Sequence, residues 1–138
     1  MSLSTTLGIR PGAKVSVVNP PPGFVARLNP LPDGVEFLVT AQSGLDVILF
    51  FVRTAGELVG RLPALARTLA LPGRLWVCWE NGKSPLDEEM VRHAALDLGL
   101  VDDKRATLDG DWVGLRLIRQ SRPRAPRPGE RRPSIASA

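Results

Sequence analysis

Two short stretches of this sequence carry side chains that could bind a ligand. The first, NPPPGF, directly follows the β-branched run KVSVV. A loop that leaves the first strand of an α/β sheet and opens a helix binds anionic groups of ligands through its backbone N–H groups. Asn19, Gly23 and Phe24 are the candidate binding residues of this loop, because they offer an amide, a flexible backbone and an aromatic ring.

Three consecutive prolines argue against the usual use of such a loop. Pro20, Pro21 and Pro22 have no N–H group, and their rings fill the space that glycine leaves open. Each lost hydrogen bond is worth about 1 kcal/mol. A ribose-binding carboxylate is also expected after the second strand, where the sequence offers only Gln42 and Ser43. We therefore expect no bound cofactor.

The second stretch, WENGKS, follows the predicted strand 74–79 and lies where open α/β sheets bind ligands. Trp79 could stack on a ring, Lys83 could meet an anion, and Ser84 completes the set of candidate ligand-binding residues. A structural interpretation is equally available. In that interpretation Trp79 packs in the core, Lys83 is solvated, and Ser84 is the N-cap of a helix over 84–98.

The sequence contains no recognisable catalytic or metal-binding set. Cys78 is the only cysteine and is predicted to be a buried thiol. The single histidine, His93, lies off the predicted buried stripe of its helix and lacks an orienting partner. That stripe consists of Leu86, Met90, Ala94 and Leu98. We expect no catalytic residue, no metal and no enzymatic activity.

Hydrophobic periodicity and turn residues predict an α/β fold. TAGE at 54–57 is a capping box, Pro63 should kink or restart the helix that follows, and Asp109–Asp111 forms a hairpin turn. The expected architecture is a three-layer, Rossmann-like, mostly parallel sheet with a C-terminal antiparallel hairpin. The predicted strands are 14–18, 35–40, 46–52, 74–79, 103–108 and 112–118, and the predicted helices are 21–29, 54–70 and 84–98.

Charge and composition divide the chain in two. Residues 1–119 carry balanced charge and form the predicted domain, whereas residues 120–138 carry five arginines and one glutamate and hold the whole excess of +4. This Pro/Arg-rich tail is predicted to be disordered. No signal peptide is visible, and the longest apolar run, Val47–Val52, is too short to span a membrane. We expect a soluble cytoplasmic protein without membrane contact.

Several segments resemble class I methyltransferase domains of the Rossmann type. PGAKVSVVN resembles the start of that family's first strand, LDVILFFV and ARTLALPGRLWV resemble its central passage, and DWVGLRLIR resembles its closing strand. More closely, the chain resembles a small, uncharacterised bacterial domain family with a truncated fold of this type. The matching residues are Leu7-Gly8, Pro11-Gly12, Gly23-Phe24, Leu75-Trp76-Val77, Lys83-Ser84, Trp112 and Gly114-Leu115-Arg116.

The resemblance implies a fold over roughly residues 7–119 and no reaction. The expected function is therefore a non-catalytic, methyltransferase-like domain that binds a small ligand or a protein partner. One alternative is a divergent S-adenosylmethionine-dependent methyltransferase, although the prolines disfavour this cofactor. A second is a nucleic-acid accessory protein that makes weak, nonspecific contacts through the tail. A third is a homodimer formed through the sheet edge or near Trp112.

Overall fold

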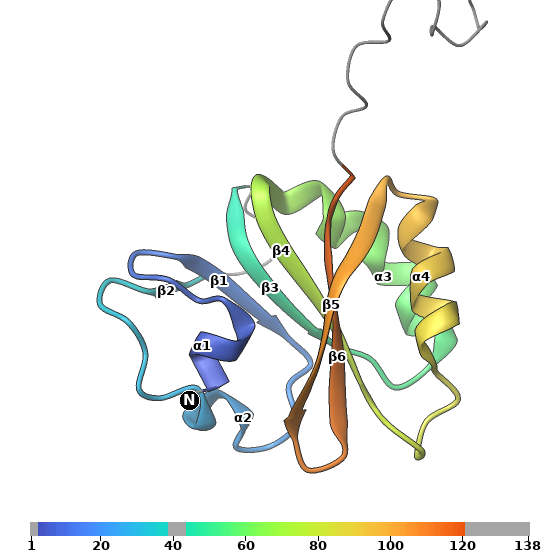
Figure 1. The fold of residues 1–138 in the computed structure, drawn as a ribbon, viewed down its shortest axis with the longest axis horizontal. Helices are drawn as coiled ribbons and strands as arrows, with labels where there is room; N and C mark the ends of the chain where they lie inside the picture. Colours follow the sequence, from blue (N-terminus) through green and yellow to red (C-terminus); the bar gives the residue numbers. More distant parts are fainter. Residues whose placement is uncertain (1–2, 39–43, 121–138) are drawn as a thin grey trace, which may run out of the picture.

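A computed structural model describes residues 3–38 and 44–120. The helices are α1 (Leu3–Leu7), α2 (Phe24–Arg27), α3 (Ala55–Thr68) and α4 (Glu88–Leu96). The strands are β1 (Lys14–Val18), β2 (Glu36–Phe37), β3 (Leu45–Phe51), β4 (Leu69–Glu80), β5 (Leu100–Asp109) and β6 (Trp112–Arg119). They form one sheet in the order β2-β1-β3-β4-β6-β5 (Figure 1).

The sheet is mixed. Strands β2, β1, β3 and β4 are parallel, and β6 and β5 complete the sheet as an antiparallel pair. The second strand of the hairpin, β6, lies next to β4, so that β5 forms the edge. The predicted α/β fold with a C-terminal antiparallel hairpin is confirmed. Residues 39–43 and 121–138, which include Gln42, Ser43 and most of the basic tail, lie outside the described ranges.

Strand β3 is apolar on both sides because both faces of the sheet are covered. Ile48, Phe50 and Val52 belong to the core beneath α3 and α4. Val47, Leu49 and Phe51 belong to a second core, which includes Leu7 of α1 and Phe24 of α2. The molecule therefore has three layers, with the longer helices on one face and the short ones on the other (Figure 1).

Helix α3 begins at the predicted capping box. The Thr54 hydroxyl accepts a hydrogen bond from the Glu57 amide at 3.1 Å, and the Glu57 carboxylate accepts from the Thr54 amide at 3.3 Å. The helix continues through Pro63 to Thr68 as one element, so the restart that the sequence allowed there does not occur. Helix α1, at the start of the described residues, was not predicted.

Helix α4 begins later than predicted. Its N-cap is Asp87, whose carboxylate accepts from the Met90 amide at 3.0 Å. Ser84 instead accepts from the Leu86 amide at 3.2 Å, within the turn that precedes the helix. The predicted N-cap at Ser84 is therefore wrong. The predicted stripe does contact the core, since Leu86 is buried in it and Met90, Ala94 and Leu98 pack against it, but the most buried residues within α4 are Val91 and Ala95. None of the helices in the described ranges is long and apolar enough to cross a membrane.

Candidate functional site

The order of the strands points to one edge of the sheet as the candidate ligand-binding edge. Strand β2 lies on one side of β1 and β3 lies on the other, so the direction of strand succession reverses between β1 and β3. Open α/β sheets bind ligands outside the carboxyl ends of the strands at such a switch point. In this chain Asn19 follows β1, and Arg53 lies two residues beyond β3.

Arg53 bridges this switch point. Its Nη1 atom donates to the backbone carbonyl of Asn19 at 3.4 Å, and its Cζ atom lies 5.5 Å from the centroid of the Trp112 ring. The Arg53 amide donates to the Glu57 carboxylate at 2.7 Å, so the capping box also fixes the backbone that carries this side chain. The result is an exposed guanidinium held over an aromatic face at the carboxyl edge.

The proline-containing loop offers few backbone donors to a ligand. Asn19 has a left-handed backbone (φ 56°), and the N-cap of α2 is Gly23. The Phe24 amide already donates to the Pro21 carbonyl at 3.1 Å. By contrast, a Cβ atom built on Gly23 would meet nothing within 4 Å, so the loop is open at that position. Helix α2 therefore begins after Gly23 without a side-chain cap.

The two predicted aromatic residues lie on opposite faces of the sheet. Phe24 is 1% exposed, and its ring centroid lies 4.5 Å from that of Phe51 in the core beneath α1 and α2. Trp79 is also 1% exposed but belongs to the core beneath α3 and α4. The structure therefore does not bring the two rings together. The aromatic residue that lies beneath the Arg53 guanidinium is Trp112, whose ring centroid is 5.2 Å from that of Phe51.

The second predicted loop contacts the tip of the closing hairpin. The ammonium of Lys83 lies 2.8 Å from the Asp111 carboxylate, and its hydrogen bond and charge interaction with Asp111 raise the pKa of Lys83. The Asn81 amide donates to the Asp111 carbonyl at 2.8 Å. Lys83 is exposed and Ser84 is half-buried. This loop therefore follows β4 along the same edge of the sheet and is attached to the strand that carries Trp112.

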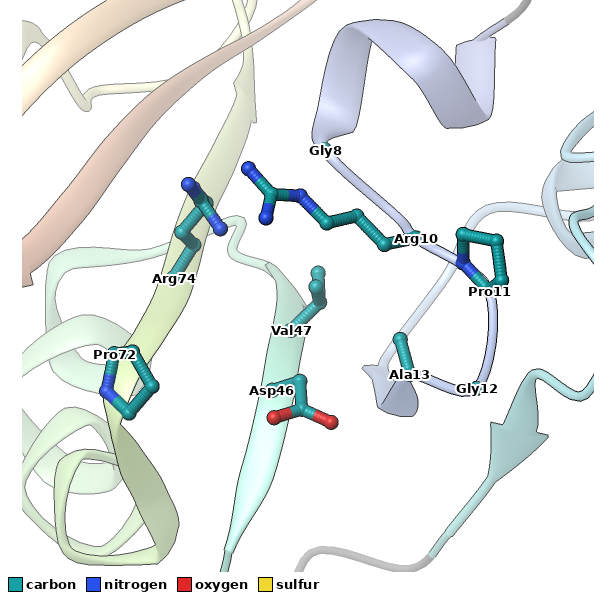
Figure 2. Close-up of a pocket in the computed structure, with 9 residues that line it drawn as sticks. All are labelled: Gly8, Arg10, Pro11, Gly12, Ala13, Asp46, Val47, Pro72 and Arg74. Atoms are coloured by element: carbon teal, nitrogen blue, oxygen red, sulfur yellow. The ribbon is translucent and has the colours of Figure 1, made fainter.

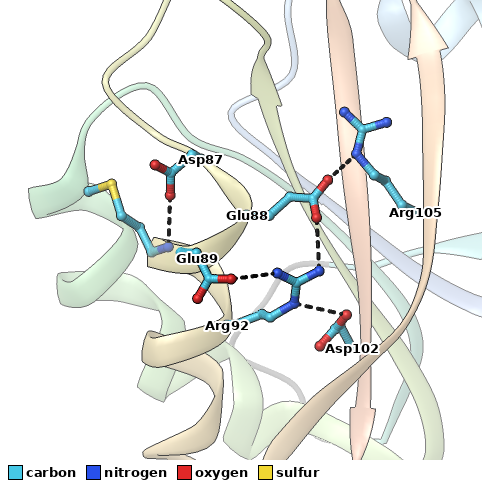
Figure 3. Close-up of polar contacts among 7 residues, drawn as sticks. Asp87, Glu88, Glu89, Arg92, Asp102 and Arg105 are labelled. Carbon is cyan, nitrogen blue, oxygen red and sulfur yellow. Dashed lines mark hydrogen bonds and ion pairs between the residues drawn. The ribbon is translucent and has the colours of Figure 1, made fainter.

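A cavity of about 390 Å³ lies beside this loop, lined by Trp79, Asn81 and the start of α4. A network of charged side chains lines its wall (Figure 3). Arg92 contacts Glu88 at 2.8 Å, Glu89 at 3.0 Å and Asp102 at 3.2 Å, and Glu88 also pairs with Arg105. These groups satisfy one another, so the network connects α4 to β5.

Sequence reasoning found the two loops but not Arg53. The sequence did contain a signal for Arg53, because this arginine lies between the apolar run 46–52 and the capping box at 54–57. Its distances to Asn19 and Trp112 depend on strand order, which the sequence leaves open. Within the residues that the structure describes, no three histidine, cysteine, aspartate or glutamate side chains are placed to hold a metal ion.

Comparison with solved structures reveals a shared fold. A putative type 11 methyltransferase from Sulfolobus solfataricus superposes with a TM-score of 0.60 at 15% identity, over 89% of this chain and 92% of its own. Magnesium protoporphyrin IX methyltransferase from Synechocystis PCC 6803, with bound S-adenosylmethionine, superposes with a TM-score of 0.59 at 11% identity, over 86% and 74%. No family model and no curated protein matches the sequence.

The methyltransferase-like fold predicted from the resemblance is confirmed by these neighbours. The expectation that no cofactor is bound is contradicted by the neighbours, because the Synechocystis enzyme holds S-adenosylmethionine. A TehB-like S-adenosylmethionine-dependent methyltransferase from Corynebacterium glutamicum also shares the fold, with a TM-score of 0.53 at 12% identity over 86% of this chain and 85% of its own. The expectation rested on the missing N–H groups of Pro20, Pro21 and Pro22 and on the lack of a carboxylate at Gln42 and Ser43, which lie outside the described residues.

Proposed function

We propose that this chain is a divergent S-adenosylmethionine-dependent methyltransferase that binds its cofactor at the carboxyl edge between β1 and β3. The observation that carries the proposal is the shared fold, with 86% of this chain superposed on a methyltransferase that holds the cofactor. The topological switch point supports the same edge. When bound, S-adenosylmethionine supplies an electrophilic methyl group.

The residues at this edge fit the amino-acid end of that cofactor. Arg53 is exposed, and its guanidinium matches a carboxylate in shape and charge. The Asn19 carbonyl, which now accepts from Arg53, is an acceptor for an ammonium group. Gly23 leaves open space at the loop. In this proposal, Arg53 replaces the backbone donors that the three prolines removed.

A second candidate function is ligand binding without methyl transfer. The observation that favours it is that both carboxylates at this edge already have hydrogen-bond or ion-pair partners. Glu57 accepts from the amides of Arg53 and Thr54, and Asp111 pairs with Lys83. Both groups have partners among the described residues, so neither is a free general base for an acceptor. This candidate keeps the non-catalytic function expected from the sequence but includes the cofactor.

Calorimetry on the full chain with S-adenosylmethionine tests the proposal. We expect saturable binding that Arg53→Gln weakens about tenfold or more, because a charge-assisted hydrogen bond is lost. Arg61→Gln is the matched control, since Arg61 is an exposed arginine on α3. It should leave the affinity unchanged.

A methyl-transfer assay with labelled cofactor then separates the two candidates. Transfer to protein, nucleic-acid or small-molecule pools, lost in Arg53→Gln, supports the methyltransferase. Binding without transfer to any pool selects the second candidate. Both candidates are rejected if calorimetry detects no heat of binding and the melting temperature does not change on addition of S-adenosylmethionine or its demethylated product.

A further inference from the structure

The opposite edge of the sheet contains a second cavity. It has a volume of about 300 Å³ and lies where β1 and β3 begin. Arg10, from the segment after α1, and Arg74, from β4, both point into it (Figure 2). The remaining lining residues are Gly8, Pro11, Gly12, Ala13, Asp46, Val47 and Pro72. We propose that this cavity binds the phosphate group of a small phosphorylated molecule.

The charge arrangement is the first reason for this proposal. Figure 2 shows the guanidinium groups of Arg10 and Arg74 directed toward one another. Among the residues that the structure describes, neither group makes an ion pair or a hydrogen bond, and neither has a further interaction. Two unpaired like charges that converge on a cavity repel each other, and an anion between them relieves that repulsion.

The neighbouring carboxylates do not supply the missing anion. Asp46 lines the cavity and contributes one negative charge against the two arginines, and its Oδ2 atom accepts from the Lys14 amide at 2.9 Å. Asp103 holds Arg116 in a two-pronged contact at 2.7 and 2.9 Å. Arg116 approaches from the same side, because a Cβ atom on Gly8 would lie 3.9 Å from its Nη1 atom. The cavity therefore keeps an excess of positive charge.

The backbone that carries Arg10 is held firmly against the sheet. The indole N–H of Trp76 donates to the Leu7 carbonyl at 3.0 Å, and Leu7 and Ile9 are buried. Gly8 has φ of 79°, and a Cβ atom there would lie 3.5 Å from Cδ of Arg74. A glycine therefore turns the chain beside Arg74. Both arginines belong to ordered segments, which lowers the entropic cost of binding an anion.

The shape of the cavity and the chemistry of its lining residues indicate which class of ligand it binds. Two planar forks of N–H donors match the oxygens of a phosphate group, and arginine is the residue best suited to that geometry. The volume lies at the lower limit of small-molecule sites. Apolar groups from Pro11, Ala13, Val47 and Pro72 line the remaining wall. A phosphate monoester with a small organic part fits this combination.

Thermal-shift titrations of the full chain, at constant ionic strength with chloride as balance, test the proposal. The probes are inorganic phosphate and ribose 5-phosphate. We expect saturable stabilisation by both, stronger with ribose 5-phosphate, and about tenfold weaker apparent affinity in Arg10→Gln and in Arg74→Gln. Arg61→Gln, on α3, should match the parent chain. Arg53→Gln should also match it, because Arg53 lies at the other edge of the sheet.

Several outcomes would overturn the proposal. These are equal stabilisation of the parent chain and Arg10→Gln, no saturable effect of either probe, or binding of a single-stranded oligonucleotide without binding of the small phosphates. Because Arg74 is half-buried, Arg74→Gln risks misfolding. Arg10 is exposed, so Arg10→Gln alone then decides the result. A positive result is independent of S-adenosylmethionine binding, which uses a different edge.

Discussion

At the scale of single residues, the centre of the sheet depends on the close fit of Trp76, Cys78 and Gly114. Gly114 lies opposite Cys78 in the ladder between β4 and β6. A Cβ atom on Gly114 would approach Cε3 of Trp76 to 2.9 Å, which is shorter than side-chain carbons tolerate. Glycine at this position therefore allows the Trp76 indole to reach the Leu7 carbonyl and to anchor the segment that carries Arg10.

The Cys78 thiol should make stability depend on pH in the alkaline range. Its side chain is fully buried, and burial raises its pKa far above the ordinary value. The unfolded chain therefore loses this proton above about pH 8.5 while the folded chain keeps it. The free energy of unfolding should fall by about 1.4 kcal/mol per pH unit from that point upward. Urea unfolding between pH 7 and about pH 10 measures this slope.

The control for this prediction is Cys78→Ala, in which the alkaline slope should become smaller by the same amount. In the native parent chain, a thiol reagent should react only after unfolding. Rapid native-state labelling, or an unchanged slope in Cys78→Ala, would contradict the burial of Cys78.

The difference between Cys78 and Arg53 shows what the sequence can predict about a single residue. Burial of Cys78 followed from its place in an apolar strand, and the structure confirms it. The role of Arg53 depends on contacts with Asn19 and Trp112, which are 34 and 59 positions away in the sequence. Such contacts are set by the order of strands in the sheet. Local patterns contain no information about that order.

At the scale of elements, the start of α4 is the clearest example of competing local signals. Ser84 followed by Pro85 predicts an N-cap and a first helical residue. Asp87 followed by Glu88 offers an equally good start three residues later. The structure adopts the second: Asp87 caps the helix, Val91 and Ala95 face the core, and Arg92 reaches Asp102 on β5. Local cap signals alone left the two starts balanced.

Removal of the Asp87 cap should destabilise the domain. Asp87→Ala leaves the Met90 amide without its partner and is expected to lower the free energy of unfolding by about 1 kcal/mol. Asp87→Asn preserves an acceptor at the N-cap and should stay close to the parent chain. Urea unfolding with far-ultraviolet circular dichroism measures both values. Equal stability of the alanine and asparagine variants would contradict this assignment of the cap.

At the scale of the whole molecule, the two candidate sites lie at opposite edges of the sheet. They also differ in their chemistry. The carboxyl edge places Arg53 over Trp112 at the switch point, and the amino edge places Arg10 and Arg74 around a cavity. The sequence predicted the layers, because strand 46–52 is apolar on both faces and the helices are well signalled. It did not predict the amino-edge site, since Arg10 and Arg74 belong to separate segments that only strand pairing brings together.

The boundary between domain and tail can be tested by truncation. The Gln120 amide donates to the Gly99 carbonyl at 2.8 Å, so the ladder of the sheet extends to that residue. A chain that ends at Gln120 loses the excess charge of +4 but no described contact. We expect its urea midpoint to equal that of the parent chain. A lower midpoint would show that residues 121–138 contribute to the stability of the fold.

Truncation after Gly110 should instead abolish cooperative folding. Strand β6 lies between β4 and β5, so its removal breaks both ladders and leaves β5 without a neighbour. Val113, Leu115 and Leu117 leave the core, and burial of each such side chain contributes about 1.5–3 kcal/mol. Their combined loss is comparable with the whole stability of a small domain, about 5–15 kcal/mol. A cooperative urea transition in this shorter chain would show that β1–β4 and α1–α4 fold without the hairpin.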